Sequence, residues 1–461
     1  MGRDVSEVTA LFTAVVGPAH VRAGDDAPEE YGHDEALTVA AQAPLAVVEP
    51  ATADEVAAVL RLADEHRIPV TARGAGTGLS GACVPQPDGI VLAFDRMRRV
   101  VEVDTENFVA VVEPGVRLDE LDAELASRGL VYPVFPGEYS ASLGGNVATN
   151  AGGMRAVKYG VTRQNVLGLE FALPSGDLLT TGGKVSKVSS GYDLTQLVVG
   201  SEGTLAVVTK AWLRLVPRLT HTATLLAPFT TLEEVTAAVP RVLASGVGPV
   251  VLEYIDMLTM AAATAYVGLD LGIPAEVKDA ALAYLVVGLE STHADRLDAD
   301  TEATGELLAS LGAIDAYVLP GASAAGLIDA REKAFWVGKA NGANDIVDVV
   351  VPRGSIPDFM ARVAELAAEH ASFVAGCGHA GDGNVHLAVF QPDPAVRSAL
   401  MRGLFAAGVA LGGAISGEHG LGRAKSPYFR ELADPAHLAL LARVKDAFDP
   451  HGILNPGLVA S

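Results

Sequence analysis

The sequence predicts an α/β or α+β enzyme of two domains, and three observations lead to this prediction. The chain has 461 residues, too many for one hydrophobic core, and 50% of them are hydrophobic. Glycine is abundant at 49 residues, whereas aromatic residues make up only 5%. Short apolar runs alternate with helical patterns along the chain. These features are typical of a folded protein with many tight turns, and they argue against a disordered or fibrous chain.

The first half of the chain is predicted to contain short strands and two helices. A helix is expected over residues 52–66, where Thr52 and Glu55 form a capping box, and a second one over residues 116–129. The period of the apolar residues and the turn signals between them predict strands over 68–73, 89–94, 98–104, 108–115, 167–176 and 203–217. Of these, the strands over 98–104 and 108–115 are expected to form a hairpin.

The pattern changes after Pro217, where longer amphipathic helices begin to alternate with strands. A helix is expected over 231–246, and strands are expected over 250–256 and 284–290. We therefore place a domain boundary near residue 218.

Charge and cysteine content exclude several classes of function. The formal net charge is −23, which argues against a nucleic-acid groove and against docking on anionic lipid. The two cysteines, Cys83 and Cys377, are consistent with a reduced cytoplasmic protein and are too few for a four-cysteine iron–sulfur cluster. We expect no signal peptide and no membrane span.

The segment "PVTARGAGTGLSGACVPQPDG" contains the pattern G-x-G-x-x-G at Gly76, Gly78 and Gly81. A nicotinamide dinucleotide site of this type needs a strand, a glycine turn and then a helix. Here Pro85 and Pro87 follow the glycines and prevent a helix. A long glycine hairpin without a ligand is one interpretation. The density of glycines instead favours a phosphate-binding loop made of backbone N–H groups.

Two further glycine-rich segments support a cofactor site. The stretch "PGEYSASLGGNVATNAGG" (136–153) reads as a turn-rich loop whose amides and hydroxyls suit a flat polar ring. A third glycine turn lies at Gly200 to Gly203. Three such segments in one domain carry more weight than any single one.

These segments, together with "KYGVTRQNVLGLEFALPSG" and "VGSEGTLAVVT", resemble the FAD-binding domain of the vanillyl-alcohol oxidase superfamily. Within it they are most similar to the D-lactate dehydrogenase, glycolate oxidase and D-2-hydroxyglutarate dehydrogenase group. The resemblance implies an α+β fold: an FAD-binding domain of two α+β subdomains over 1–218, with a helical lead-in to about residue 40. A cap domain with an antiparallel sheet over 219–435 and a C-terminal return over 436–461 would follow.

The same resemblance implies which residues hold FAD. The pyrophosphate would be wrapped by Arg73, Gly74, Ala75, Gly76, Thr77, Gly78, Leu79 and Ser80. The flavin would be lined by Pro136, Gly137, Ser142, Gly145, Asn146, Thr149, Gly152 and Gly153. The adenosine or ribityl end would lie near Glu202, Gly203 and Val208, and Asn455 would touch the isoalloxazine. The first loop has no histidine, so we expect the FAD to be non-covalent.

Two C-terminal segments, "CGHAGDGNVHLAVF" and "AISGEHGLGRAK", concentrate histidines and carboxylates between glycines. Two imidazoles and a carboxylate suit a divalent transition metal. Asp382 competes as a ligand, although "GDG" is also a common turn. The resemblance implies that His379, His386 and Glu418 bind zinc, or alternatively manganese or iron, and that His419 is the general base. The resemblance also implies that Arg331 binds the substrate carboxylate. An equally weighted alternative is that Arg331 is a solvated arginine on the surface of a helix.

Departures from the family pattern bear on the substrate. Relatives that act on 2-hydroxyglutarate tend to place an amide two residues after the second metal histidine, where this chain has Ala388. They also place a hydroxyl group and a lysine in the segment that contains the substrate arginine. In this chain, Phe335 and the stretch "NDIVDVVVP" offer neither group at the corresponding positions. A second carboxylate on the substrate would therefore be buried without a partner, which is unfavourable. This favours a monocarboxylic D-2-hydroxy acid such as lactate or glycolate as the substrate.

The alternatives are a non-redox transferase of the ether-lipid synthase type and a flavoprotein subunit of a multi-subunit glycolate oxidase. Quinone, cytochrome, electron-transfer flavoprotein, an iron–sulfur subunit and oxygen all fit as electron acceptor. Any contact with a membrane would be peripheral, through that acceptor, and a homodimer is compatible with the sequence.

Overall fold

The computed structural model describes residues 4–459, and the chain divides into two compact units. Unit 1 comprises Met1–Ala151, Val161–Arg218 and Glu418–Ser461, whereas unit 2 comprises Gly152–Gly160 and Leu219–Gly417. The predicted FAD-binding domain begins at residue 1 and the predicted C-terminal segment ends at residue 461. Of these two segments, residues 1–3 and 460–461 lie outside the described residues. No helix among the described residues is long and apolar enough to cross a membrane.

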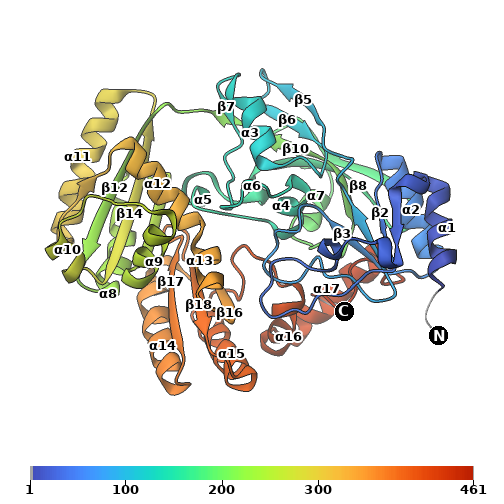
Figure 1. Ribbon diagram of the computed structural model, residues 1–461. Coiled ribbons are helices and arrows are strands. Elements are labelled where there is room, and N and C mark those ends of the chain that lie inside the picture. The colour runs from blue at the N-terminus through green and yellow to red at the C-terminus, as the bar shows by residue number, and fades with distance from the viewer. Residues whose placement is uncertain (1–3, 460–461) are drawn as a thin grey trace. The chain divides into compact units, whose positions relative to one another are not determined.

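The first sheet of unit 1 has four strands in the order β1 (Val21–Ala23), β2 (Ala46–Val48), β4 (Ile90–Ala93) and β3 (Val70–Arg73). Strands β2, β4 and β3 run parallel. Helices α1 (Val5–Val16) and α2 (Ala53–Glu65) lie side by side near this sheet (Figure 1). The amphipathic pattern of α2 buries one face on the strands, and Thr52 caps its first turn.

The second sheet of unit 1 has the order β5 (Val100–Asp104), β6 (Val109–Val112), β10 (Val207–Arg214), β8 (Val166–Ala172) and β9 (Leu178–Gly182). All its pairs are antiparallel, and β5 and β6 form the predicted hairpin. Around it lie α3 (Leu118–Ala126), α4 (Leu143–Thr149), α6 (Thr162–Asn165), α7 (Leu194–Val198) and the short pair β7 (Leu130–Val131) and β11 (Val216–Pro217). Helices α16 (Gly422–Leu432) and α17 (Pro435–Phe448) complete the unit.

Unit 2 is built on one antiparallel sheet of seven strands. Their order is β15 (Tyr317–Val318), β12 (His221–Phe229), β14 (Ala283–Ser291), β13 (Val251–Asp256), β17 (Phe373–Gly378), β18 (Asn384–Phe390) and β16 (Asp345–Val350). The helices are α5 (Ala156–Tyr159), α8 (Leu232–Ala244), α9 (Met257–Val267), α10 (Ala275–Ala280), α11 (Ala294–Ser310), α12 (Gly321–Glu332), α13 (Ala334–Ala340), α14 (Ile356–Glu369) and α15 (Pro394–Ala410) (Figure 1). The predicted α+β fold with an antiparallel sheet in the second domain is confirmed.

The return of the chain to unit 1 starts at Glu418, whereas the family resemblance implied a return at residue 436. Hydrogen bonds to the glycine loops explain this earlier return. The buried Glu202 carboxylate accepts the N–H groups of Leu421 and Gly422 at 2.8 and 2.7 Å. The Ser80 hydroxyl lies 3.1 Å from the carbonyl oxygens of His419 and Gly420. Residues 152–160, which we assigned to the first domain, are grouped with unit 2.

Candidate active site

The first glycine loop follows β3 directly and contains no helix before β4 begins at Ile90. Gly76 has a φ of +75°, and a Cβ atom added there would lie 2.0 Å from the Arg73 guanidinium. Arg73 is buried and donates to the carbonyl oxygen of His33, while its guanidinium lies 5.3 Å from the centre of the Tyr31 ring. At Gly76 the loop backbone therefore has no side chain and lies beside the Arg73 guanidinium, which is held in place. An anion-binding loop requires both features.

The second glycine segment differs from its prediction as a loop, because residues Leu143–Thr149 form the short helix α4. Ser142 caps this helix by accepting the N–H of Gly145 at 3.3 Å. The Ser142 hydroxyl oxygen also accepts the N–H of Ala75 at 3.3 Å, and a Cβ atom on Gly74 would lie only 1.9 Å from it. The first and second glycine segments therefore meet at Ser142.

The side chain of Asn146 also indicates that a ligand binds in this region. Its side chain is 4% exposed, and its amide nitrogen has no hydrogen-bond partner among the residues that the structure describes. A buried donor without a partner is costly, so a ligand acceptor is the expected compensation. Together with the bare glycine backbone, this donor fits a large polar ring system such as FAD.

The third glycine turn connects to the chain's C-terminus. Glu202 has a φ of +52° and Gly203 one of +69°. Burial raises the pKa of Glu202, against the opposing effect of the N–H groups of Leu421 and Gly422. The Asn455 amide nitrogen lies 2.9 Å from the carbonyl oxygens of Ala82 and Glu202, so Asn455 joins the first and third turns. These bonds give Asn455 a structural role, and its predicted contact with the isoalloxazine stays a prediction.

The remaining predicted cofactor residues are dispersed over the two units. Gly137 takes a φ of +83° after the half-buried Pro136, Thr149 donates to the carbonyl oxygen of Gly145, and Val208 packs against the core of the second sheet. Gly152 and Gly153 belong to unit 2. The sequence pattern missed Asp34, a buried carboxylate that accepts the N–H of Ala36 at 3.1 Å and lies against Gly78. Burial raises its pKa.

We predict that Gly76→Ala weakens FAD binding. An alanine at a φ of +75° costs about 1–2 kcal/mol, and its Cβ atom would displace the Arg73 guanidinium. The matched control is Gly129→Ala, where φ is +66° and a Cβ atom would meet nothing within 4 Å. Both variants should lose unfolding free energy through the left-handed backbone, and Gly76→Ala should lose more because its Cβ atom meets Arg73. Only Gly76→Ala should raise the dissociation constant of FAD, measured by flavin fluorescence. Equal FAD affinity in the two variants would contradict the assignment of this loop.

The two predicted metal-binding histidines come from neighbouring parts of the unit 2 sheet. His379 directly follows β17, and His386 lies in β18. The centres of their rings are 4.8 Å apart, with the rings nearly perpendicular. Within the sheet, His386 pairs with Cys377 on one side and with Asp348 of β16 on the other. The fold of unit 2 therefore brings both imidazoles together.

A buried glutamate that the sequence pattern missed supports His379. The Glu253 side chain is 1% exposed, and its Oε1 atom lies 2.7 Å from His379 Nδ1. Its Oε2 atom lies 2.7 Å from Arg331 Nη2, and the Arg331 side chain is 9% exposed. Burial alone would raise the pKa of Glu253, but the charges of His379 and Arg331 outweigh it and hold the pKa below its usual value. Arg331 is thus buried in an ion pair, in contrast to the alternative of a solvated helix arginine.

A second buried carboxylate, Asp348, lies beside His386. Its Oδ1 atom is 3.7 Å from His386 Nδ1 and accepts the Asn384 amide at 2.9 Å. Its Oδ2 atom accepts the Ser416 hydroxyl at 2.7 Å and the Gly417 N–H at 3.1 Å. Gly417 is the last residue of unit 2, and Glu418 follows it directly in the chain. Asp348 therefore fixes the start of the segment that carries the third predicted ligand.

The predicted base, His419, belongs to unit 1. Its Nε2 atom lies 4.0 Å from Glu418 Oε1, and its backbone oxygen lies 3.1 Å from the Ser80 hydroxyl of the first glycine loop. Gly420 then turns the chain with a φ of +76°. A hydrogen bond thus joins the backbone of His419, the predicted base, to the loop predicted to hold the FAD pyrophosphate.

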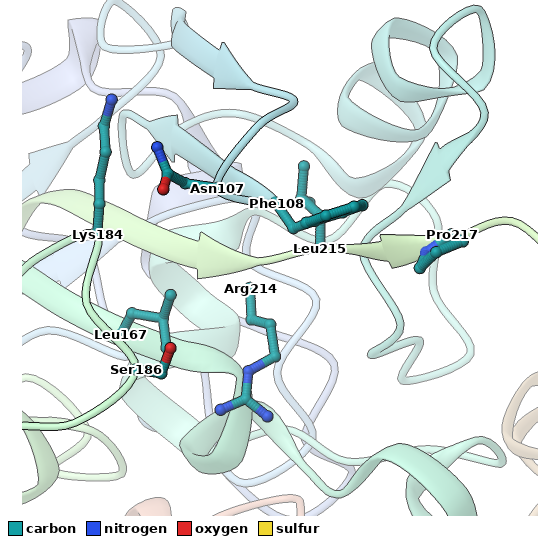
Figure 2. A pocket seen from close by; sticks show the side chains of 8 residues that line it. All are labelled: Asn107, Phe108, Leu167, Lys184, Ser186, Arg214, Leu215 and Pro217. Carbon is teal, nitrogen blue, oxygen red and sulfur yellow. The ribbon is translucent and has the colours of Figure 1, made fainter.

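A pocket of about 440 Å³ opens on another part of unit 1 (Figure 2). It is lined by Asn107, Phe108, Leu167, Lys184, Ser186, Arg214, Leu215 and Pro217. Lys184 pairs with Glu102 and Asp104 at 2.5 and 2.8 Å. None of the residues predicted for the cofactor, the metal or catalysis lines this pocket.

Comparisons with known proteins agree with this geometry. Residues 44–182 match the FAD binding domain family, and residues 218–459 match the C-terminal domain of FAD linked oxidases. The chain is 57% identical over 455 residues to an uncharacterised FAD-linked oxidoreductase of Mycobacterium tuberculosis, covering 99% of each chain. It is 36% identical to a D-lactate dehydrogenase of Anaerostipes hadrus, covering 96% of this chain and 95% of the relative. A glycolate oxidase subunit of Bacillus subtilis is 35% identical, with 90% and 88% covered.

Solved structures support the fold alone. A 4-ethylphenol oxidase from Gulosibacter chungangensis matches with a TM-score of 0.78 at 19% identity, covering 98% of this chain and 96% of that one. A structure of p-cresol methylhydroxylase matches with a TM-score of 0.77 at 18% identity, covering 99% and 96%. The chain belongs to the FAD-linked oxidase family, and it is an FAD-linked oxidoreductase.

Proposed function

We propose that the protein is an FAD-linked dehydrogenase that oxidises a D-2-hydroxy monocarboxylic acid, of the lactate or glycolate type, to the 2-oxo acid. One observation carries this proposal: in unit 2, a buried arginine and a histidine share one buried glutamate, beside a second histidine. A guanidinium suits a substrate carboxylate, and paired imidazoles suit a metal. Both groups are needed to bind a 2-hydroxy acid through its carboxylate and its hydroxyl.

The residues divide the reaction between them. Arg331 binds the substrate carboxylate, and His419 accepts the proton of the hydroxyl group. The glycine loops of unit 1 would hold FAD, which when bound would supply the acceptor for the hydride from C2. The substrate thus loses one proton and one hydride, which leaves a 2-oxo acid.

His379 and His386 of unit 2 offer two ligands that suit a divalent metal, and Glu418 is the predicted third ligand; zinc is the first choice, with manganese or iron as alternatives. The fit rests on the donors themselves, because each imidazole has a buried carboxylate near its Nδ1 atom and keeps its Nε2 atom as a ligand. Such an ion, once bound, lowers the pKa of a coordinated hydroxyl group and so assists its deprotonation.

The monocarboxylate preference rests on what surrounds β18. Ala388, two residues after His386, offers only a methyl group, and a Cβ atom on Gly338 of α13 would lie 3.3 Å from it. A second substrate carboxylate directed there would meet no cation or amide on these two residues. The names of the relatives, D-lactate dehydrogenase and glycolate oxidase subunit, fit the same substrate class.

Anaerobic mixing of the FAD-bound protein with single 2-hydroxy acids tests the proposal. D-lactate or glycolate should bleach the flavin absorbance band, whereas L-lactate and D-2-hydroxyglutarate should act far more slowly. Dialysis against a chelator should abolish bleaching, and added zinc, manganese or iron should restore it. If no 2-hydroxy acid bleaches the flavin, the redox function is wrong and the non-redox transferase alternative gains support.

The electron acceptor can be identified with the same preparation. Reduced flavin should be reoxidised rapidly by the physiological acceptor, so quinone, cytochrome, electron-transfer flavoprotein and oxygen can be compared directly. Slow reoxidation by all of these would favour an iron–sulfur subunit, as expected for one component of a multi-subunit glycolate oxidase.

A further inference from the structure

Glu253 occupies an unusual place for a charged residue, because it lies within the buried strand β13 between two apolar neighbours. Strand side chains alternate between faces, so Glu253 points to the same face as Ile255. Ile255 packs in one core cluster with Leu327 of α12, the helix that also carries Arg331. The fold therefore directs the Glu253 carboxylate toward α12 and toward the end of β17.

A buried carboxylate at this position requires compensation. An unpaired charge inside a protein is strongly unfavourable, and an apolar residue would suit the strand better. Both oxygens of Glu253 are instead engaged, Oε1 by His379 Nδ1 and Oε2 by Arg331 Nη2, each at 2.7 Å. One side chain thus contacts two residues that have separate roles in the proposed function.

We propose that Glu253 is a positioning residue that orients His379 for metal binding and Arg331 for binding the substrate carboxylate. This inference rests on the proposed function and adds a residue to it. Glu253 acts through these two side chains and touches neither the metal nor the substrate.

The chemistry of the contacts sets the effect on His379. An ionised carboxylate can only accept hydrogen bonds, so His379 must carry its proton on Nδ1. The lone pair is then on Nε2, which becomes the ligand atom, and the ring is held in one orientation. Without the carboxylate, the ring is free to rotate and to place its proton on either nitrogen.

The second contact determines the effect on Arg331. The guanidinium has a rigid, planar arrangement of donors, so fixing Nη2 on Glu253 also fixes the direction of the remaining N–H groups. A substrate carboxylate then meets a guanidinium that is already oriented. Because one carboxylate serves both residues, its loss should weaken metal binding and substrate binding together, which loss of packing alone would not do.

The test compares Glu253→Gln with a matched control in the same strand. Asp256→Asn removes another carboxylate of β13, one that accepts the N–H groups of Thr259 and Gly376 at 2.7 and 2.5 Å. Zinc binding to the resting, metal-free protein is measured by equilibrium dialysis, and cobalt binding by its visible absorbance. Glu253→Gln should weaken both about 10- to 100-fold, whereas Asp256→Asn should change them less than twofold. The KM for D-lactate should rise in Glu253→Gln alone.

If Glu253→Gln does not fold, Glu253→Asp provides the test, because it keeps the charge but withdraws the carboxylate by one methylene group. It should weaken zinc binding and raise KM to a smaller extent. Wild-type zinc affinity and wild-type KM in either folded variant would overturn the inference. Metal binding is measured without substrate, so a failure of the proposed function, seen as the absence of flavin bleaching, is distinguishable from a failure of the inference.

Discussion

His419→Ala should slow the reduction of bound FAD by D-lactate about 10²- to 10⁴-fold, the usual contribution of a positioned general base. The physical reason is that hydride transfer from C2 requires loss of the hydroxyl proton, and alanine cannot accept it. The rate is measured by anaerobic stopped-flow absorbance of the flavin. FAD content and zinc content should stay at wild-type levels, because His419 is assigned to neither ligand set.

His451→Ala is a suitable control for this variant. His451 also belongs to the C-terminal segment of unit 1, but its imidazole is on the surface and its Nδ1 atom lies 2.8 Å from Asp64 Oδ1. Its replacement should leave flavin reduction unchanged. Reduction of the His419→Ala protein at the wild-type rate would exclude His419 as the base, whatever the control shows.

The sequence predicted those parts of the fold in which local signals agree with the tertiary structure. Pro85 and Pro87 correctly excluded a helix after the first glycine loop, and β3 and β4 run parallel across that loop without one. The helix α4 was missed because Gly144 and Gly145 lie in its first turn and lower its propensity. Ser142 caps α4 and contacts the first loop, so tertiary contacts compensate for the weak propensity.

The candidate site was predictable only where its residues lie in motifs. His379, His386, Glu418 and His419 became candidates because glycines surround them in two short segments. Glu253 and Asp348 were missed because each lies between apolar neighbours inside a buried strand, where the surrounding pattern predicts only a strand. A single carboxylate inside such a run is a usable signal, since a buried charge needs a partner. The sequence does not indicate which partner, because His379 is 126 residues from Glu253.

Arg331→Met should have two separable effects, one on stability and one on substrate binding. Arg331 is the permanently charged partner of the buried Glu253, so its removal leaves this carboxylate with only its contact to the His379 imidazole. Breaking a buried pair in this way costs about 3–5 kcal/mol of unfolding free energy. Arg362→Ala is the control in the same unit, because Arg362 makes exposed pairs with Glu365 and Glu369 that are worth about 0–1 kcal/mol. Denaturant unfolding of the full-length protein measures the change in unfolding free energy for both variants.

The effect on substrate binding is separated from the effect on stability by comparing D-lactate with propane-1,2-diol, which has the hydroxyl group but no carboxylate. Under conditions where Arg331→Met remains folded, its kcat/KM should fall strongly for D-lactate and little for the diol. Arg331→Lys should restore part of the stability but little of the D-lactate activity, because an ammonium group lacks the planar fork that holds a carboxylate with two hydrogen bonds. Equal losses with both substrates would mean that Arg331 only balances the charge of Glu253. A selective loss with D-lactate means that the guanidinium contacts the carboxylate, since the two substrates differ in that group alone.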